Sequence, residues 1–150
     1  MKKIHMAIID DEIQSNYVDN YKIKKIYLGS ERTSSEAGPF SHSTICFLIF
    51  QEYVSVQVEY SNICILDQTE RASIDHMIKA LIWCEKNNVD LINLSLGSVK
   101  RADGLALRKI VNRLAAKGVI FVCSADNDNY ITYPACFSNV KSSSSNKQSR

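Results

Sequence analysis

Asp90-Leu91-Ile92-Asn93-Leu94-Ser95-Leu96-Gly97-Ser98 is the stretch that decides the fold of this chain. Its apolar first half is typical of a buried strand. Its small polar end is typical of the open end of such a strand, where a ligand can reach the backbone. Amphipathic segments precede and follow it. This alternation of helix and strand predicts an α/β fold, in which a parallel sheet has helices on both faces.

Helical periodicity occurs on both sides of this strand. Before it, apolar residues recur at the spacing of one helical face: Ile74, Met77, Ile78, Leu81 and Ile82. After it, Asp103 is the predicted N-cap of a second helix that stops at Gly118. The apolar run 119–123 then predicts the next buried strand of the same sheet.

Polar residues are expected to gather at one edge of this sheet. The apolar run 4–9 predicts a first strand, and it ends in the acidic residues 10–12. Because parallel strands end on the same side, these carboxylates should lie at the edge that also holds Ser95 and the polar segment 124–129. That edge is the candidate ligand site.

The region between the first strand and the central strand contains a candidate histidine. Ser41 is a predicted N-cap, which places His42 in the first turn of a helix whose body, 45–50, is apolar on all sides. A helix of that composition is expected to run through the core. Residues 14–40 are expected to form a long surface loop, and residues 54–66 to contain at least one strand.

Length and composition indicate one soluble domain. The chain has 150 residues, of which 45% are hydrophobic, so it is long enough to bury a substantial core. We expect a domain at 1–140 and a disordered Ser-rich tail at 141–150. The net charge of +2 is too small to indicate nucleic-acid binding, and no apolar run reaches the length of a membrane span.

The cysteines favour a reducing compartment, because their number is odd and no C-x-x-C pair occurs. They are Cys46, Cys64, Cys84, Cys123 and Cys136. The apolar run near the N-terminus ends at Asp10 without a small-residue cleavage site, so no signal peptide is expected. A cytoplasmic location is the resulting expectation.

Four pieces of the sequence together resemble the subtilisin-like serine peptidases, the subtilase family. They are Ala7-Ile8-Ile9-Asp10, Ser41-His42-Ser43-Thr44, Asp90 to Gly97, and Ala125-Asp126-Asn127 with Tyr133-Pro134-Ala135. The pieces occur in the family's order, with matching helices between them. The resemblance implies a subtilisin-like fold and hydrolysis of peptide bonds.

In that family the triad has the chain order Asp, His, Ser. The resemblance implies that Asp10 orients the imidazole and that His42 is the general base. It also implies that Asn127 donates a hydrogen bond to the tetrahedral oxyanion. The substrate-binding residues that it implies are Ser95, Leu96, Gly97 and Ala125. A peptide or protein is the expected substrate, and no metal or other cofactor is expected.

The sequence departs from the family at several positions. Glu12, Ser43 and Asp126 stand where the family has glycine, and a carboxylate at position 126 would oppose an oxyanion. The family's nucleophile lies in a Gly-Thr-Ser segment, which has no counterpart after Val140. The resemblance therefore implies an N-terminal portion that is inactive alone. It is a truncated product, one half of a split enzyme that a Ser-bearing C-terminal fragment completes, or a remnant used for binding.

Two other functions stay open. In a response-regulator receiver, Asp10 and Asp11 would bind Mg²⁺, Asp67 would accept phosphate, and Ser95 and Lys117 would be switch residues. The receiver lysine follows a strand, however, whereas Lys117 ends a predicted helix. The second alternative is a non-catalytic module that captures an extended peptide by strand addition at the end of the central strand.

Overall fold

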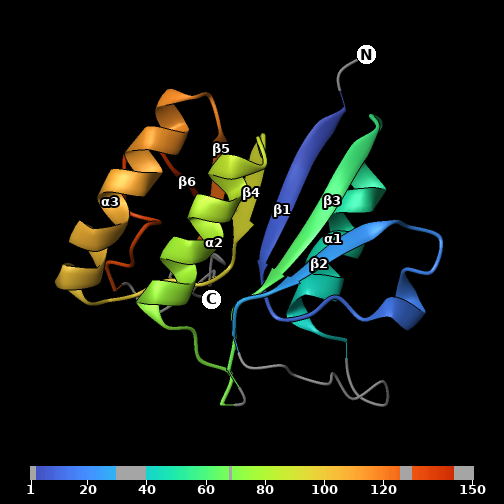
Figure 1. Cartoon of the computed structure of the whole chain (residues 1–150), viewed down its shortest axis with the longest axis horizontal. Helices are drawn as coiled ribbons and strands as arrows, with labels where there is room; N and C mark the ends of the chain where they lie inside the picture. Colours follow the sequence, from blue (N-terminus) through green and yellow to red (C-terminus); the bar gives the residue numbers. More distant parts are fainter. Residues whose placement is uncertain (1–2, 30–39, 68, 126–129, 144–150) are drawn as a thin grey trace, which may run out of the picture.

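The computed structural model describes residues 3–29, 40–67, 69–125 and 130–143. In these residues, six strands form one parallel sheet in the order β2-β3-β1-β4-β5-β6 (Figure 1). The strands are β1 Ile4–Asp10, β2 Ile23–Tyr27, β3 Val58–Cys64, β4 Leu91–Leu94, β5 Ile120–Ser124 and β6 Lys141–Ser143. The helices are α1 His42–Tyr53, α2 Ile74–Lys86 and α3 Arg101–Ala116, with a short 3-10 turn, η1, at Ser15–Tyr17. The parallel α/β prediction is confirmed.

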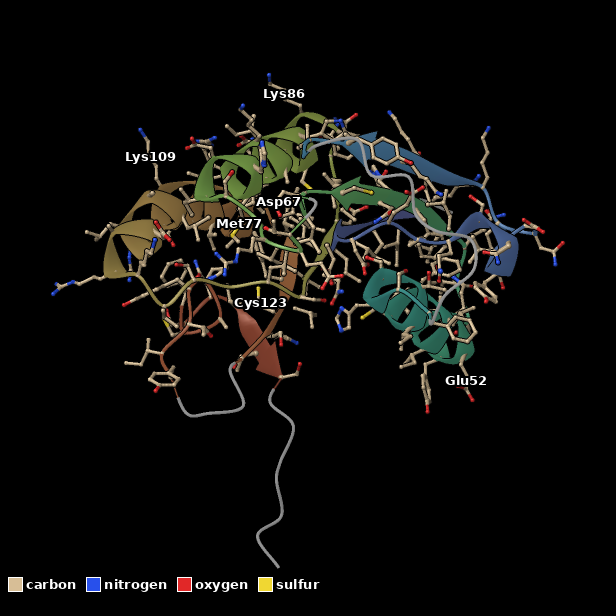
Figure 2. All side chains as sticks on the ribbon, turned by 90° about the horizontal axis from the view of Figure 1, so that it is seen from below. Glu52, Asp67, Met77, Lys86, Lys109 and Cys123 are labelled. Atoms are coloured by element: carbon tan, nitrogen blue, oxygen red, sulfur yellow. The ribbon has the colours of Figure 1, made fainter. Side chains whose placement is uncertain are left out.

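The helices cover the two faces of the sheet unequally. α2 and α3 lie on one face, and α1 lies on the other beside β1 and β3 (Figures 1 and 2). Side chains alternate between the faces along each strand. Ala7 and Ile9 of β1 therefore join the larger core under α2 and α3, whereas Met6 and Ile8 join the smaller core under α1. The prediction of helices on both faces is confirmed.

The two amphipathic helices form where their periodicity predicted them. The Ser73 hydroxyl caps α2 by accepting a hydrogen bond from the backbone N–H of His76. α3 begins at Arg101, so the prediction of Asp103 as its N-cap is wrong. The Asp103 carboxylate lies instead in the first turn, where the Ser98 hydroxyl donates to it and the helix dipole favours its charge.

Two predicted irregular segments contain strands. Within 14–40, Ile23–Tyr27 forms β2, which pairs with β3 and is the edge strand of the sheet that the described residues form. An edge strand tolerates charged side chains, and the Lys25 ammonium of β2 donates to the Glu12 carboxylate at 2.8 Å. Lys141–Ser143 forms β6, where the predicted tail was to begin, because its backbone pairs with β5. Residues 144–150 lie outside the described residues.

α1 does not run through the core, contrary to the expectation from its composition. Its fully buried side chains are Ser43, Thr44 and Phe47, whereas Ile45 and Ile49 are exposed. One side of this helix packs on the sheet, and among the described residues no further layer covers its other side. None of the described helices has the length and apolar content needed to cross a membrane.

Candidate functional site

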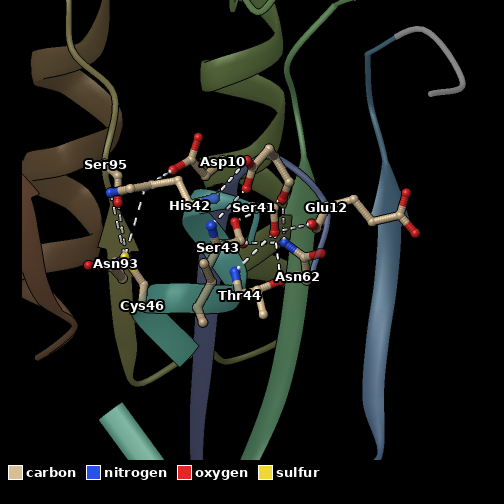
Figure 3. Close-up of polar contacts among 12 residues, drawn as sticks. Asp10, Glu12, Ser41, His42, Ser43, Thr44, Cys46, Asn62, Asn93 and Ser95 are labelled. Atoms are coloured by element: carbon tan, nitrogen blue, oxygen red, sulfur yellow. Dashed lines mark hydrogen bonds and ion pairs between the residues drawn. The ribbon is translucent and has the colours of Figure 1, made fainter. Parts of the chain in front are cut away.

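The last residue of β1 meets the first residue of α1 at the carboxyl end of the sheet. The Asp10 Oδ2 atom is 2.6 Å from the His42 Nδ1 atom (Figure 3). The side chain of Asp10 is 5% exposed and that of His42 is 57% exposed. An ionised carboxylate only accepts hydrogen bonds, so Nδ1 donates and Nε2 of a neutral His42 is left as an acceptor. The structure thus brings the two predicted residues together; their catalytic roles stay predictions.

Burial of Asp10 sets the electrostatics of this pair. Burial raises the pKa of the Asp10 carboxyl above its ordinary value, although the hydrogen bond from His42 opposes the rise. The nearby Asp11 carboxylate raises it further. A carboxylate that water solvates poorly attracts a neighbouring cation strongly. Asp10 is therefore a poorly hydrated carboxylate held directly against Nδ1 of His42.

The loop after β1 holds the first turn of α1 in place. The Ser41 hydroxyl accepts a hydrogen bond from the Thr44 backbone N–H and donates to the Glu12 carbonyl, which confirms Ser41 as the N-cap. The Asp11 carboxylate accepts hydrogen bonds from the backbone N–H groups of His42 at 3.0 Å and Ser43 at 2.8 Å. Asp11 is thus a second cap of α1, whereas Asp10 faces the imidazole.

Asn62, in the middle of β3, supports the same loop and was not singled out from the sequence. Its side chain is fully buried. Its Oδ1 accepts from the Ile13 N–H at 2.8 Å, and its Nδ2 donates to the carbonyls of Ile8 at 3.3 Å and Asp11 at 3.0 Å. The available signal was an amide directly before the apolar run 63–66, since such a group is buried only where it has partners.

The end of β4 lies beside the Asp10–His42 pair. A cavity of about 300 Å³ is lined by Asp10, Asp11, His42, Leu66, Glu70, Ser95 and Leu96. A second cavity, of about 340 Å³, adjoins it because Glu70 and Leu96 line both, and Gly97 lines the second. A Cβ atom on Gly97 would lie 3.2 Å from the Tyr133 carbonyl oxygen, so this edge is tight.

Ala125 and Asn127 are the remaining predicted site residues. Ala125 follows β5 and donates its backbone N–H to the Ser143 carbonyl at 2.9 Å, but it lines neither of these two cavities. Asn127, the predicted oxyanion donor, and Asp126 lie outside the described residues. The described part of the site is therefore the Asp10–His42 pair with the 95–97 edge.

Cys46 is a further neighbour of His42 that sequence reasoning placed only in the core. Its Sγ atom is 3.8 Å from Nε2 and 3.9 Å from Nδ1 of His42, one helical turn away. Burial raises the pKa of the Cys46 thiol, and the carboxylates of Asp10 and Asp11 raise it too. The thiol stays protonated at neutral pH and is a weak nucleophile.

The receiver residues are not assembled at one site. Asp67 Oδ1 accepts hydrogen bonds from Thr69 and the Arg71 backbone in its own loop, which lowers the pKa of Asp67. The Lys117 ammonium lies 2.7 Å from the Glu85 carboxylate, at the opposite end of the sheet from Asp10. This separation does not suit phosphoryl transfer to Asp67.

Sequence comparison relates the chain to proteases. The model of the subtilase family matches residues 53–148, which is more than half of the chain. The minor extracellular protease Epr of Bacillus subtilis (strain 168) is 26% identical over 150 residues, covering 93% of this chain and 23% of that protein. Subtilisin E of the same organism is 26% identical over 146 residues, covering 88% of this chain and 38% of subtilisin E.

Structural comparison shows the same fold. A mutant of the protease domain of PatA aligns with a TM-score of 0.74 at 20% identity, over 93% of this chain and 56% of that one. A lanthipeptide protease aligns with a TM-score of 0.72 at 18% identity, over 93% of this chain and 47% of that one. The chain thus spans about half of these solved structures and less of the two curated relatives.

Proposed function

This chain belongs to the subtilase family, and we propose that it forms the Asp–His and peptide-binding part of a serine endopeptidase. One observation carries the proposal: the buried Asp10 carboxylate holds Nδ1 of the exposed His42 at 2.6 Å beside the end of β4. In this role His42 Nε2 takes the proton of an attacking serine and later gives it to the leaving amine. Asp10 stabilises the imidazolium in between.

The peptide lies in this proposal along residues 95–97. Parallel sheets bind ligands beyond the carboxyl ends of their strands, and the cavity lined by Ser95 and Leu96 also holds His42. Gly97 lies so close to Tyr133 that a side chain there would be crowded. This supports an edge at which the peptide contacts backbone atoms. In this proposal Ala125 forms part of the pocket wall, and Asn127 is the oxyanion donor.

The nucleophile in this proposal comes from polypeptide outside the 150 residues. No Gly-Thr-Ser segment occurs within them. A fluorophosphonate probe, which phosphonylates an activated serine with loss of fluoride, therefore leaves the isolated chain unlabelled. Labelling that disappears in His42→Ala would show a serine of this chain to be the nucleophile and would overturn this part of the proposal.

A peptidyl alkylating agent tests the Asp–His and peptide-binding roles on the chain as it exists. Succinyl-Ala-Ala-Pro-Phe chloromethyl ketone bound along 95–97 places its chloromethyl carbon at His42 Nε2. The nitrogen displaces chloride, an N–C bond forms, and the surplus proton goes to solvent. Mass spectrometry should find His42 modified at least about tenfold faster than His76 of the same chain.

Two variants sharpen this experiment. Cys46→Ser removes the neighbouring thiol as a competing nucleophile, so the alkylation rate of His42 is measured without competition from Cys46. In that background, Gly97→Leu should slow alkylation of His42 and leave His76 unchanged, because the larger side chain obstructs the peptide edge. Equal rates at the two histidines, or no effect of Gly97→Leu, would contradict peptide binding at this edge.

A further inference from the structure

We propose that a cavity at the amino ends of β2 and β3 binds a small amphipathic anion, a molecule with an apolar body and a carboxylate or phosphate group. Lys3, which precedes β1, lines this cavity, whereas Asp10 is the last residue of β1. The cavity therefore lies at the opposite end of the sheet from the Asp10–His42 pair. It is a binding site in addition to the proposed peptide edge and does not depend on it.

The cavity lies where the pairing between β2 and β3 stops. The first paired residues are Ile23 and Tyr60, so Val58 and Glu59 of β3 extend beyond the part that pairs with β2. Figure 1 shows the amino ends of the two strands diverging. Ile23, Val58 and Glu59 line a cavity there of about 500 Å³, which is within the usual range of small-molecule sites, about 300–1,000 Å³.

One part of the cavity lining is apolar. Ile23, Val58 and Tyr60 line the cavity, and all three pack in the smaller core on the α1 face. The Tyr60 ring is held there by edge-to-face contacts with Phe47 and Phe50, at 4.9 Å and 6.2 Å between ring centroids. These packed side chains form a wall that exists before a ligand arrives and that suits an apolar body.

The other part of the lining is positively charged. Lys3, Lys22 and Lys24 line the cavity, and Glu59 is the acidic residue of the lining. Lys3 and Lys22 are exposed, and neither forms an ion pair within the part of the chain that the structure describes. The Lys24 ammonium lies 5.2 Å from the centroid of the Trp83 ring of α2. Three ammonium groups beside one carboxylate leave a surplus of positive charge, which attracts an anion.

The apolar and charged groups lie on different faces at this end of the sheet. Ile23 packs on the α1 face, whereas Lys24, the next residue of β2, points to the opposite face, where it meets Trp83. A ligand in the gap between the strands contacts the apolar wall with one part and the ammonium groups with another. A purely polar anion would leave the wall exposed to water, and an uncharged molecule would leave the charges unpaired. An amphipathic anion suits both.

Titrations followed by ¹H–¹⁵N correlation NMR test the site on the whole chain. The probes are 4-phenylbutyrate and phenyl phosphate, which join a phenyl ring to a carboxylate and to a phosphate. At least one of them should shift the amide signals of Ile23 and Val58 with saturation, and the tighter binder identifies the anionic group. Uncharged 4-phenylbutanol and inorganic phosphate each lack one half of the ligand, so they should bind at least about tenfold more weakly.

Charge variants test the role of the lysines. Lys3→Gln combined with Lys22→Gln should weaken binding of the tighter probe at least about tenfold, because two ammonium groups are lost. Both side chains are exposed, so the Tm of this double variant should match that of the parent. Lys109→Gln, at an exposed position of α3, is the control and should leave binding unchanged (Figure 2).

Four results would overturn the site. The first is the lack of a saturable shift with either probe, and the second is equally tight binding of 4-phenylbutanol or inorganic phosphate. The third is unchanged binding by the double variant. The fourth is a set of shifted signals that gathers at 95–97 instead of at Ile23 and Val58.

Discussion

At the scale of single residues, the candidate site depends on two neighbouring carboxylates with different partners. Asp10 holds the imidazole of His42, whereas Asp11 caps the helix that carries this imidazole. The Asp10–His42 pair could be predicted because the sequence resembles a known family. The cap by Asp11 and the support by Asn62 could not be predicted, because both depend on the path of the loop after β1, which no local pattern specifies.

Asn62 offers a test of how strongly this loop is held. In Asn62→Leu, the backbone groups of Ile8, Ile13 and Asp11 lose their side-chain partners in a buried place. Unsatisfied buried groups of this kind cost about 1–3 kcal/mol each, so the loss of partners for three groups should lower the free energy of unfolding by at least about 3 kcal/mol. Urea unfolding measures it.

The control for this substitution is Asn112→Leu, at an exposed position of α3. Surface substitutions of this kind change the free energy of unfolding by about 0.5 kcal/mol or less. If Asn62→Leu were equally mild, the loop after β1 would not depend on the Asn62 amide.

At the scale of secondary-structure elements, predictability followed the strength of the local pattern. α2 and α3 each present one apolar face to the sheet, and their periodicity was sufficient to predict them. β2 was missed because an edge strand with two lysines has no clear apolar alternation. The environment of α1 was mistaken because composition alone does not say which apolar side chains find a neighbour in the described structure.

The contact between α2 and α3 gives a pH-dependent prediction. Hydrogen bonds from Arg113 and Lys117 lower the pKa of Glu85 from 4.5 to about 2. A depressed pKa stabilises the folded state above pH 4.5, and that contribution is lost as the pH falls toward 2. The Tm of the parent should therefore exceed that of Glu85→Gln at pH 6. The difference should disappear as the pH falls from 4.5 to about 2.

Salt and a matched variant complete this test. The groups lie at the surface, so the Tm difference should be small and should shrink as ionic strength rises. Glu52→Gln removes the same charge from an exposed position of α1. It should leave the fall of Tm at acidic pH as it is in the parent. A Tm difference for Glu85→Gln that persists unchanged at pH 2 would rule out the ion pair as its cause.

At the scale of the whole molecule, the order of the strands creates the site. β1 lies between β3 and β4, so the carboxyl end of β1 delivers Asp10 next to the end of β4 at Ser95. The alternation of helices and strands was enough to predict a parallel sheet and this common edge. It could not predict that Ile120 of β5 stays 50% exposed, because periodicity does not say which neighbours cover a strand.

The fold presents His42 as a base whose Nδ1 is engaged by Asp10 and whose Nε2 is left as an acceptor beside the Cys46 thiol. The tautomer of His42 measures this most directly, through long-range ¹H–¹⁵N correlation NMR of the chain labelled at its three histidines. His42→Gln assigns the signal. We predict a neutral imidazole protonated at Nδ1, and a loss of this preference in Asp10→Ala. A neutral His42 protonated at Nε2, or a tautomer balance that Asp10→Ala leaves unchanged, would contradict the claim.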